Sequence, residues 1–410
     1  MSAASPKGRP SQVLFALYVA LTVLFGVVNG VTGPVLPELE AQADLDSAGI
    51  GDVFLYRGVG SMAGGFAIGF ILDAVRDPHA VLVALLALKA AAELTMPFSS
   101  DLESLGFQFC IIAFCGNAIA TVILTAVSWT YGEMMGPQMN VLNAVFGVGA
   151  SAAPLLVAAF RDVGAHGVFA YWAIACVDMV FIVAAVAIPA TTNPRLAAKE
   201  DSRSEASGLP VSGNNAFGYV ELRDATQEVN WLAVSLCGAC VLFACVIDSA
   251  VTFWLFTYST QQLEMSAEAA GSMNTAFFLT FTATRFLCGW LVTVVGAACI
   301  LKGSLAVALI ASLGIVSPHL GHVLPCLGMI GVGIGVAPIA ANATTVLGQK
   351  SFISGRAQGC VRVLAALGVM IGASGVGFLQ NWDSVGDGAM PLVVFIGLVA
   401  ETIVTIAFLW

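Results

Sequence analysis

VLFACVIDSAVTFWLFTYS (residues 241–259) and AAGSMNTAFFLTFTATRFLCGWL (residues 269–291) are two long apolar stretches separated by a short acidic turn. Each holds one interior charge, Asp248 in the first and Arg285 in the second. A soluble helical hairpin with a buried ion pair would account for one such pair of segments. Within lipid, a charge is costly unless it faces a partner or a water-filled cavity, which makes both residues functional candidates.

The composition of the whole chain decides between a soluble helical hairpin and a pair of membrane-spanning helices. The 410 residues are 59% hydrophobic and only 10% charged, with a mean hydropathy of +0.93, whereas soluble domains carry about 25% charged residues. Apolar windows of about 20 residues, long enough to span as helices, recur along the chain. The sequence therefore predicts an all-α polytopic membrane protein. The expected spans are 12–33, 49–72, 79–97, 105–131, 137–160, 167–190, 230–259, 266–292, 295–316, 320–346, 352–379 and 389–410.

The spans fall into two groups of six. Residues 1–190 form an N-terminal six-helix half, residues 191–229 a polar cytoplasmic linker, and residues 230–410 a C-terminal six-helix half. Two such halves suggest pseudo-repeats about an axis along the membrane normal, with a substrate site near the midplane. Glycines at three- and four-residue spacing, such as Gly60 and Gly64 or Gly368 and Gly372, predict close helix packing.

The distribution of charged residues predicts the orientation. Basic residues gather on the side of the N-terminus and the linker: Lys7, Arg9, Arg76, Arg195, Lys199, Arg203, Arg223, Lys302, Lys350 and Arg356. The opposite connections contain only Arg161 and are otherwise acidic. The positive-inside rule therefore places both termini in the cytoplasm. The plasma membrane is the default location. The net charge of −10 is mostly this acidic outer face and is not a nucleic-acid or anionic-substrate signature, so we expect no nucleic-acid partner. The expected partners are a lipid bilayer and a small-molecule substrate, a sugar, and the expected state is a monomer.

No motif for catalysis or cofactor binding is visible. The ten cysteines lie in apolar segments and suit small packing residues. No nucleophile–base set or dinucleotide fingerprint appears, so we expect neither an enzyme, nor a metal site, nor a cofactor.

Several motifs resemble the major facilitator superfamily, and within it the sodium-dependent glucose transporter branch, with fucose permease as a more distant relative. They include GVTGPVLPELE (30–40), YRGVGSMAGGFAIGFILD (56–73), AVSWTYG (126–132) and QMNVLNAVFGVGASAAPLL (138–156). In the seventh and eighth spans, Asp248, Trp254 and Arg285 take positions typical of the family. The resemblance covers nearly the whole chain and implies twelve transmembrane helices in the major facilitator fold, working by alternating access.

The resemblance also assigns roles and shows departures. Gly69 and Asp73, with Arg76 as the nearby base, are similar to a degraded loop motif between the second and third spans, which implies a gating role. Asn143 stands where a histidine is usual. Relatives carry acids in the first and fourth spans, but this chain has Asn29 and Asn117 there. If those acids couple transport to a cation, the ion site here is altered or lost.

The charged residues within the spans allow more than one interpretation. The Asp248 carboxylate could bind a coupling cation such as Na⁺, take up a proton, or accept hydrogen bonds from sugar hydroxyls. Alternatively, it forms a structural ion pair with Arg57, Arg285 or Arg362. Arg57 and Arg285 occupy similar places in the second and eighth spans, and this symmetry favours a structural or gating role, capping carbonyls or bridging helices. Arg362 in the eleventh span would favour an anionic substrate.

Amides and aromatic rings complete the candidate substrate site. Sugar recognition needs paired hydrogen-bonding groups and an aromatic face, and the alternative role for each amide is an interhelical hydrogen bond. The predicted substrate-binding set is Asn29, Trp129, Asn140, Asn143, Asp248, Trp254, Asn274, Gln358 and Arg362. Outside this set, Lys89 and Glu93 lie one helical turn apart and are expected to satisfy each other, with Asp178 and Glu401 as supporting contacts.

The favoured function is a secondary transporter of a hexose or similar small neutral polyol, coupled to a cation. Three alternatives remain open at this point. They are the same fold carrying a small organic anion, a facilitative uniporter, and a non-transporting membrane sensor.

Overall fold

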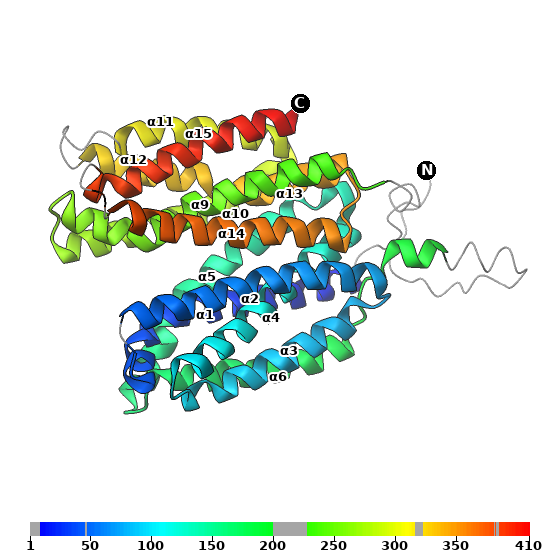
Figure 1. The fold of residues 1–410 in the computed structure, drawn as a ribbon. Coiled ribbons are helices and arrows are strands. Elements are labelled where there is room, and N and C mark those ends of the chain that lie inside the picture. Colours follow the sequence, from blue (N-terminus) through cyan, green and yellow to red (C-terminus); the bar gives the residue numbers. More distant parts are fainter. Residues whose placement is uncertain (1–8, 46, 200–227, 316–322, 381, 383–384) are drawn as a thin grey trace, which may run out of the picture. The chain divides into compact units, whose positions relative to one another are not determined.

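The computed structural model describes residues 9–45, 47–199, 228–315, 323–380, 382 and 385–410 (Figure 1). Its described residues form helices and connections without a strand, which confirms the all-α prediction. Twelve helical segments among them are long and apolar enough to cross a membrane. Of the expected linker, residues 200–227 lie outside the described residues.

The helices follow the predicted spans, but their ends differ in both directions: α1 is longer than predicted and α6 is shorter. Those of the first half are α1 (Arg9–Ala43), α2 (Ser47–Ala74), α3 (Pro78–Thr95), α4 (Leu102–Tyr131), α5 (Gly136–Asp162) and α6 (Ala170–Ala187). Those of the second half are α9 (Trp231–Gln261), α10 (Ala267–Val295), α11 (Ala297–Ile315), α12 (Val323–Val336), α13 (Ile339–Lys350), α14 (Gly355–Gln380) and α15 (Ala389–Leu409).

Side-chain caps fix where several helices begin. The Asp101 carboxylate accepts a hydrogen bond from the Ser104 N–H at 2.8 Å at the start of α4. Asn230 does the same for α9 and Ser266 for α10. These residues satisfy N–H groups that have no partner inside the helix.

The tenth span differs from the prediction of one continuous segment. Residues 337–338 form a turn that separates α12 from α13. Pro338 has no N–H to donate and disfavours helical geometry at Ala337, so the span is interrupted there.

The described chain forms two compact units. Unit 1 comprises Met1–Met135, Val145–Val229 and Ser351–Cys360, and unit 2 comprises Gly136–Ala144, Asn230–Lys350 and Val361–Trp410. The start of α14 therefore belongs with helices of the first half, and the start of α5 with helices of the second.

Glycines allow helices to approach closely within each unit. In unit 1, a Cβ on Gly60 of α2 would lie 2.2 Å from the Cys110 carbonyl oxygen of α4. In unit 2, a Cβ on Gly372 of α14 would lie 2.2 Å from the Val246 carbonyl oxygen of α9. These contacts confirm the close packing predicted from the glycine spacing.

Candidate functional site

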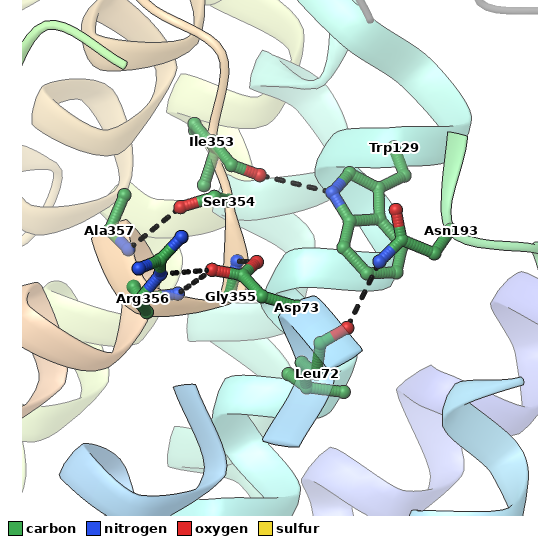
Figure 2. A network of polar contacts seen from close by, with 9 residues as sticks. All are labelled: Leu72, Asp73, Trp129, Asn193, Ile353, Ser354, Gly355, Arg356 and Ala357. Atoms are coloured by element: carbon green, nitrogen blue, oxygen red, sulfur yellow. Dashed lines mark hydrogen bonds and ion pairs between the residues drawn. The ribbon is translucent and has the colours of Figure 1, made fainter. Parts of the chain in front are cut away.

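Asp73, at the end of α2, holds the first turn of α14 in unit 1 (Figure 2). Its Oδ1 accepts a hydrogen bond from the Gly355 N–H at 2.7 Å, and its Oδ2 accepts from Arg356 Nε at 2.8 Å and from the Arg356 N–H at 3.3 Å. Ser354 Oγ caps the same turn by accepting from the Ala357 N–H at 3.2 Å. A carboxylate is stabilised at a helix N-terminus because unpaired N–H groups and the helix dipole point toward it.

The segment before α14 is held by a second set of contacts. Trp129 Nε1 donates to the Ile353 carbonyl oxygen at 3.0 Å (Figure 2). The Arg195 guanidinium lies 4.2 Å from the centroid of the Phe352 ring. Trp129 is only 3% exposed, so in this structure its indole anchors the segment and offers no open face to a sugar ring.

The end of α2 is fixed by Asn193. Its side-chain Nδ2 donates to the Leu72 carbonyl oxygen at 3.0 Å (Figure 2), and its backbone N–H donates to the Arg76 carbonyl oxygen at 3.0 Å. Arg76 thus takes part through its backbone, and its side chain is exposed.

Glycines bring α2 and α14 into backbone contact beside Asp73. A Cβ on Gly355 would lie 2.6 Å from the Gly69 carbonyl oxygen, and a Cβ on Gly359 would lie 2.6 Å from that of Gly65. Any side chain at these positions would separate the two helices.

Arg57 of α2 contacts α1, also in unit 1. Its Nη2 donates to Asn29 Oδ1 at 2.6 Å, and its Nη1 lies 3.4 Å from Thr32 Oγ1. Asn29 Nδ2 in turn donates to the Phe25 carbonyl oxygen at 2.8 Å. Arg57 thus bridges two helices, and the Asn29 amide is engaged at both ends.

In unit 2, Arg285 bridges helices as Arg57 does in unit 1. Its Nε donates to the Ala337 carbonyl oxygen at 3.1 Å, at the break before Pro338, and its Nη1 donates to the Asn143 carbonyl oxygen at 3.1 Å. The guanidinium lies 4.1 Å from the centroid of the Phe281 ring. Arg285 therefore caps carbonyls of both the interrupted tenth span and the start of α5.

Asp248 and Trp254 lie on α9 in unit 2. Arg285 is the charged neighbour of the Asp248 carboxylate, and the Thr252 hydroxyl is hydrogen bonded to it. Trp254 Nε1 donates to the Ala373 carbonyl oxygen of α14 at 2.9 Å. Arg362 of α14 lies near the Cys245 thiol of α9.

Two asparagines form a buried amide pair in unit 2. Asn140 of α5 and Asn342 of α13 face each other with both N···O distances at 3.5 Å. Each also donates to a carbonyl of its own helix, Gly136 at 3.0 Å and Pro338 at 2.8 Å. Asn143 similarly donates to Met139 at 2.9 Å. These amides serve helix contacts in this structure.

Asn274 and Gln358 behave differently from the other amides of the predicted substrate-binding set. Asn274 Oδ1 in unit 2 and Gln358 Oε1 in unit 1 are both buried, and neither has a hydrogen-bond partner within the described structure. Unpaired buried acceptors are unusual and costly, which marks both side chains as candidates for contact with a ligand.

Comparison with known proteins identifies the family. The model of the Major Facilitator Superfamily matches residues 18–407. The chain belongs to the Major Facilitator Superfamily. It is accordingly an integral, multi-pass membrane protein, and its family and fold point to a transporter rather than an enzyme.

Sugar transporters are among its relatives. The chain is 23% identical to sodium-dependent glucose transporter 1 of Danio rerio over 93% of its own length, and spans 66% of that relative's length. It is similar in fold to the E. coli fucose:proton symporter FucP, with a TM-score of 0.71, 15% identity and coverage of 97% and 98% of the two chains. The proton:xylose symporter XylE bound to 6-bromo-6-deoxy-D-glucose gives a TM-score of 0.76 at 11% identity, with 96% and 94% covered.

Another solved structure of similar fold is named as a transporter of organic anions, not of sugars. The human organic anion transporter MFSD10 (TETRAN) gives a TM-score of 0.69 at 14% identity, with 98% of this chain and 100% of that chain covered. At these identities, the solved structures establish the shared fold.

The predicted site residues of this superfamily member separate into distinct groups. In unit 1 the structure joins Asn29 to Arg57, and Asp73 to the start of α14. In unit 2 it joins Asn143 to Arg285. Sequence reasoning missed five residues that contact the predicted set or pack beside it: Ile353, which accepts from Trp129; Asn193, which donates to the Arg76 carbonyl; Asn342, which pairs with Asn140; Gly355, which donates to Asp73; and Gly359, which packs on Gly65. Ser354 before an apolar helix is an N-cap signal, and Pro338 marks the break before α13, so part of this arrangement is visible in the sequence.

Proposed function

We propose that this chain is a secondary transporter that moves a hexose or similar small neutral polyol by alternating access, coupled to Na⁺ or H⁺. The names of its relatives include glucose, fucose and xylose transporters. The Asp73–Gly355 bond supports the gating part of the proposal, because it joins a residue of the N-terminal half to one of the C-terminal half. A contact of this kind must break and re-form during alternating access.

The unpaired oxygens of Asn274 and Gln358 carry the substrate assignment. Each is a buried hydrogen-bond acceptor that lacks a donor. Sugar hydroxyls supply donors, whereas a carboxylate or phosphate ligand supplies only acceptors. We assign Asn274 and Gln358 to hydroxyl recognition and Asp248 to cation coupling.

The rival assignment is a small organic anion. It is favoured by Arg362 within a span and by the fold likeness to an organic anion transporter. Arg362→Ala tests this rival, because normal sugar uptake in the variant would count against the anion assignment. A uniporter would take up substrate at a rate that does not depend on the Na⁺ or H⁺ gradient, and a sensor would show no uptake.

The proposal also includes a monomer in the plasma membrane. Both termini are assigned to the cytoplasm, because the distribution of Lys and Arg favours that orientation. The orientation is tested by introducing cysteines at residues 5 and 215 and treating intact cells with a membrane-impermeant thiol reagent. Labelling of these cysteines without permeabilisation would show that the termini and the linker lie outside the cell.

The deciding experiment is uptake of radiolabelled glucose, fucose and xylose into proteoliposomes, with Na⁺ and H⁺ gradients imposed separately. Wild type is compared with Asn274→Leu, Gln358→Leu and Asp248→Asn. Thr280→Val is the matched control, because the Thr280 hydroxyl on α10 already donates to carbonyls of its own helix.

We expect the two amide variants to raise KM at least tenfold, because each loses a hydrogen bond to a bound hydroxyl, and Asp248→Asn to abolish accumulation against a gradient. Thr280→Val should transport normally. Absence of uptake of all three sugars by wild type would overturn the substrate assignment.

A further inference from the structure

Unit 1 contains a charged triad that the proposed transport mechanism does not use. Lys89 and Glu93 of α3 form the predicted ion pair, at 2.7 Å, but they do not satisfy each other fully as expected, because Glu93 keeps an unpartnered oxygen. Lys89 Nζ also lies 2.5 Å from Asp178 Oδ2 of α6. The three side chains are almost fully buried, with exposures of 3% for Lys89 and 0% for both acids.

The triad is not neutral if all three groups are ionised. One ammonium then faces two carboxylates, which leaves a net charge of −1. The other titratable groups facing it are Cys115 of α4 and Tyr171 of α6, and neither supplies a positive charge at neutral pH. From α1 the neighbours are the apolar Leu21, Leu24 and Phe25. A buried, uncompensated charge is strongly unfavourable, so the site requires one more positive charge.

The carboxylate oxygens show where that charge can reside. Asp178 Oδ1 and Glu93 Oε2 are buried without a hydrogen-bond partner in the described structure. Both carboxylates contact the same ammonium, and the Glu93 carboxyl group lies within hydrogen-bonding reach of Asp178. A proton on one carboxyl group would donate to the other, which satisfies an orphaned acceptor and cancels the excess charge in one step.

A small cavity lies against Lys89 and Asp178. Its volume is about 10 Å³, near the lower limit for one water molecule. The rest of its lining consists of apolar side chains and Gly116. It therefore lacks the set of oxygen ligands that a hard metal cation needs, and Lys89 and Asp178 are the polar groups in its lining to which a water could hydrogen bond.

We propose that Lys89, Glu93 and Asp178 form a proton-binding site in which the two carboxyl groups share one exchangeable proton beside the Lys89 ammonium. The site is separate from Asp248 and is independent of which substrate the protein carries. Loss of the proton leaves the triad with a charge of −1 and its return restores neutrality, so the N-terminal half carries its own site for H⁺.

Infrared spectroscopy of the purified protein tests this site without transport. The carbonyl stretch of protonated carboxyl groups is recorded at neutral pH for wild type, Glu93→Gln, Asp178→Asn and the double variant, each as a difference from wild type. Glu38→Gln is the control, because Glu38 forms a one-to-one pair with Arg161 at 2.7 Å.

A shared proton predicts a non-additive result. Each single variant leaves one carboxylate paired with one ammonium and should lose the same single band, and the double variant should lose no more than either. Glu38→Gln should lose nothing. The band should shift in D₂O and be unaffected by Na⁺.

Four results would overturn the proposal. Intact bands in both single variants would mean that no proton is bound, and additive losses would mean that each acid holds its own. A band removed by Na⁺ would assign the site to a metal cation. Failure of the amide variants to fold, beside normal folding of Glu38→Gln, would also count against it, because an amide reproduces the shape of a protonated carboxyl group.

Discussion

The Asp73 carboxylate and the Gly355 backbone N–H are hydrogen bonded at 2.7 Å although 282 residues separate them. The contact depends on backbone geometry more than on the nearby ion pair, because it uses an N–H group at the first turn of α14 that no helical carbonyl can satisfy. The Arg356 side chain, by contrast, is 49% exposed. The negative charge of Asp73 should therefore matter more than the positive charge of Arg356.

Asp73→Asn should loosen the start of α14 more than Arg356→Gln does. Hydrogen bonds to charged groups contribute about 1.5–3 kcal/mol, whereas an exposed ion pair contributes at most about 1 kcal/mol. We expect amide hydrogen exchange in residues 351–360 to become about tenfold faster in Asp73→Asn, since about 1.4 kcal/mol is a factor of ten. Equal exchange in the two variants would show that the ion pair dominates.

Gly359→Ala should disrupt the contact between α2 and α14. The added Cβ would lie 2.6 Å from the Gly65 carbonyl oxygen, a backbone atom that cannot rotate away. We expect a lower thermal midpoint in detergent and reduced transport. Gly375→Ala, in the same helix, is the control, because a Cβ there meets nothing within 4 Å. That variant should be neutral or stabilised by up to about 1 kcal/mol, because alanine favours helices.

Trp129→Phe tests the anchor before α14. The change keeps an aromatic ring but removes the donor to the Ile353 carbonyl. Ile353 is 3% exposed, and leaving a buried acceptor unpaired costs about 1–3 kcal/mol. Trp172→Phe removes a similar indole bond, to the Leu94 carbonyl at 2.9 Å, but Trp172 is 37% exposed. The thermal midpoint should fall clearly for Trp129→Phe and little for Trp172→Phe, and the reverse order would contradict the anchor.

The helices could be predicted from the sequence because hydrophobic length and composition determine membrane spans locally. The break at Pro338 has a local cause, yet the surrounding apolar run conceals it. The partners of Trp129 and Asp178 could not be predicted in the same way. An indole or carboxylate in an apolar segment has many possible acceptors or donors, and only the packing of distant helices brings Ile353 to one and Lys89 to the other.

Asp101 provides a prediction about pH outside the membrane spans. The hydrogen bond from the Ser104 backbone N–H lowers the pKa of the Asp101 carboxyl below its ordinary value of 3.8. Because the folded pKa is lower than the unfolded one, the stabilisation is complete above the ordinary value and is lost as the pH falls through the folded value.

Asp101→Asn keeps an oxygen acceptor for the cap but cannot ionise. The thermal midpoint of wild type should therefore exceed that of Asp101→Asn at neutral pH, and the difference should shrink as the pH drops below 3.8. Asp101→Ala removes the cap itself, so it should be less stable than both wild type and Asp101→Asn across the pH range. A difference between wild type and Asp101→Asn that stays constant with pH would show that the charge of Asp101 does not contribute to the start of α4.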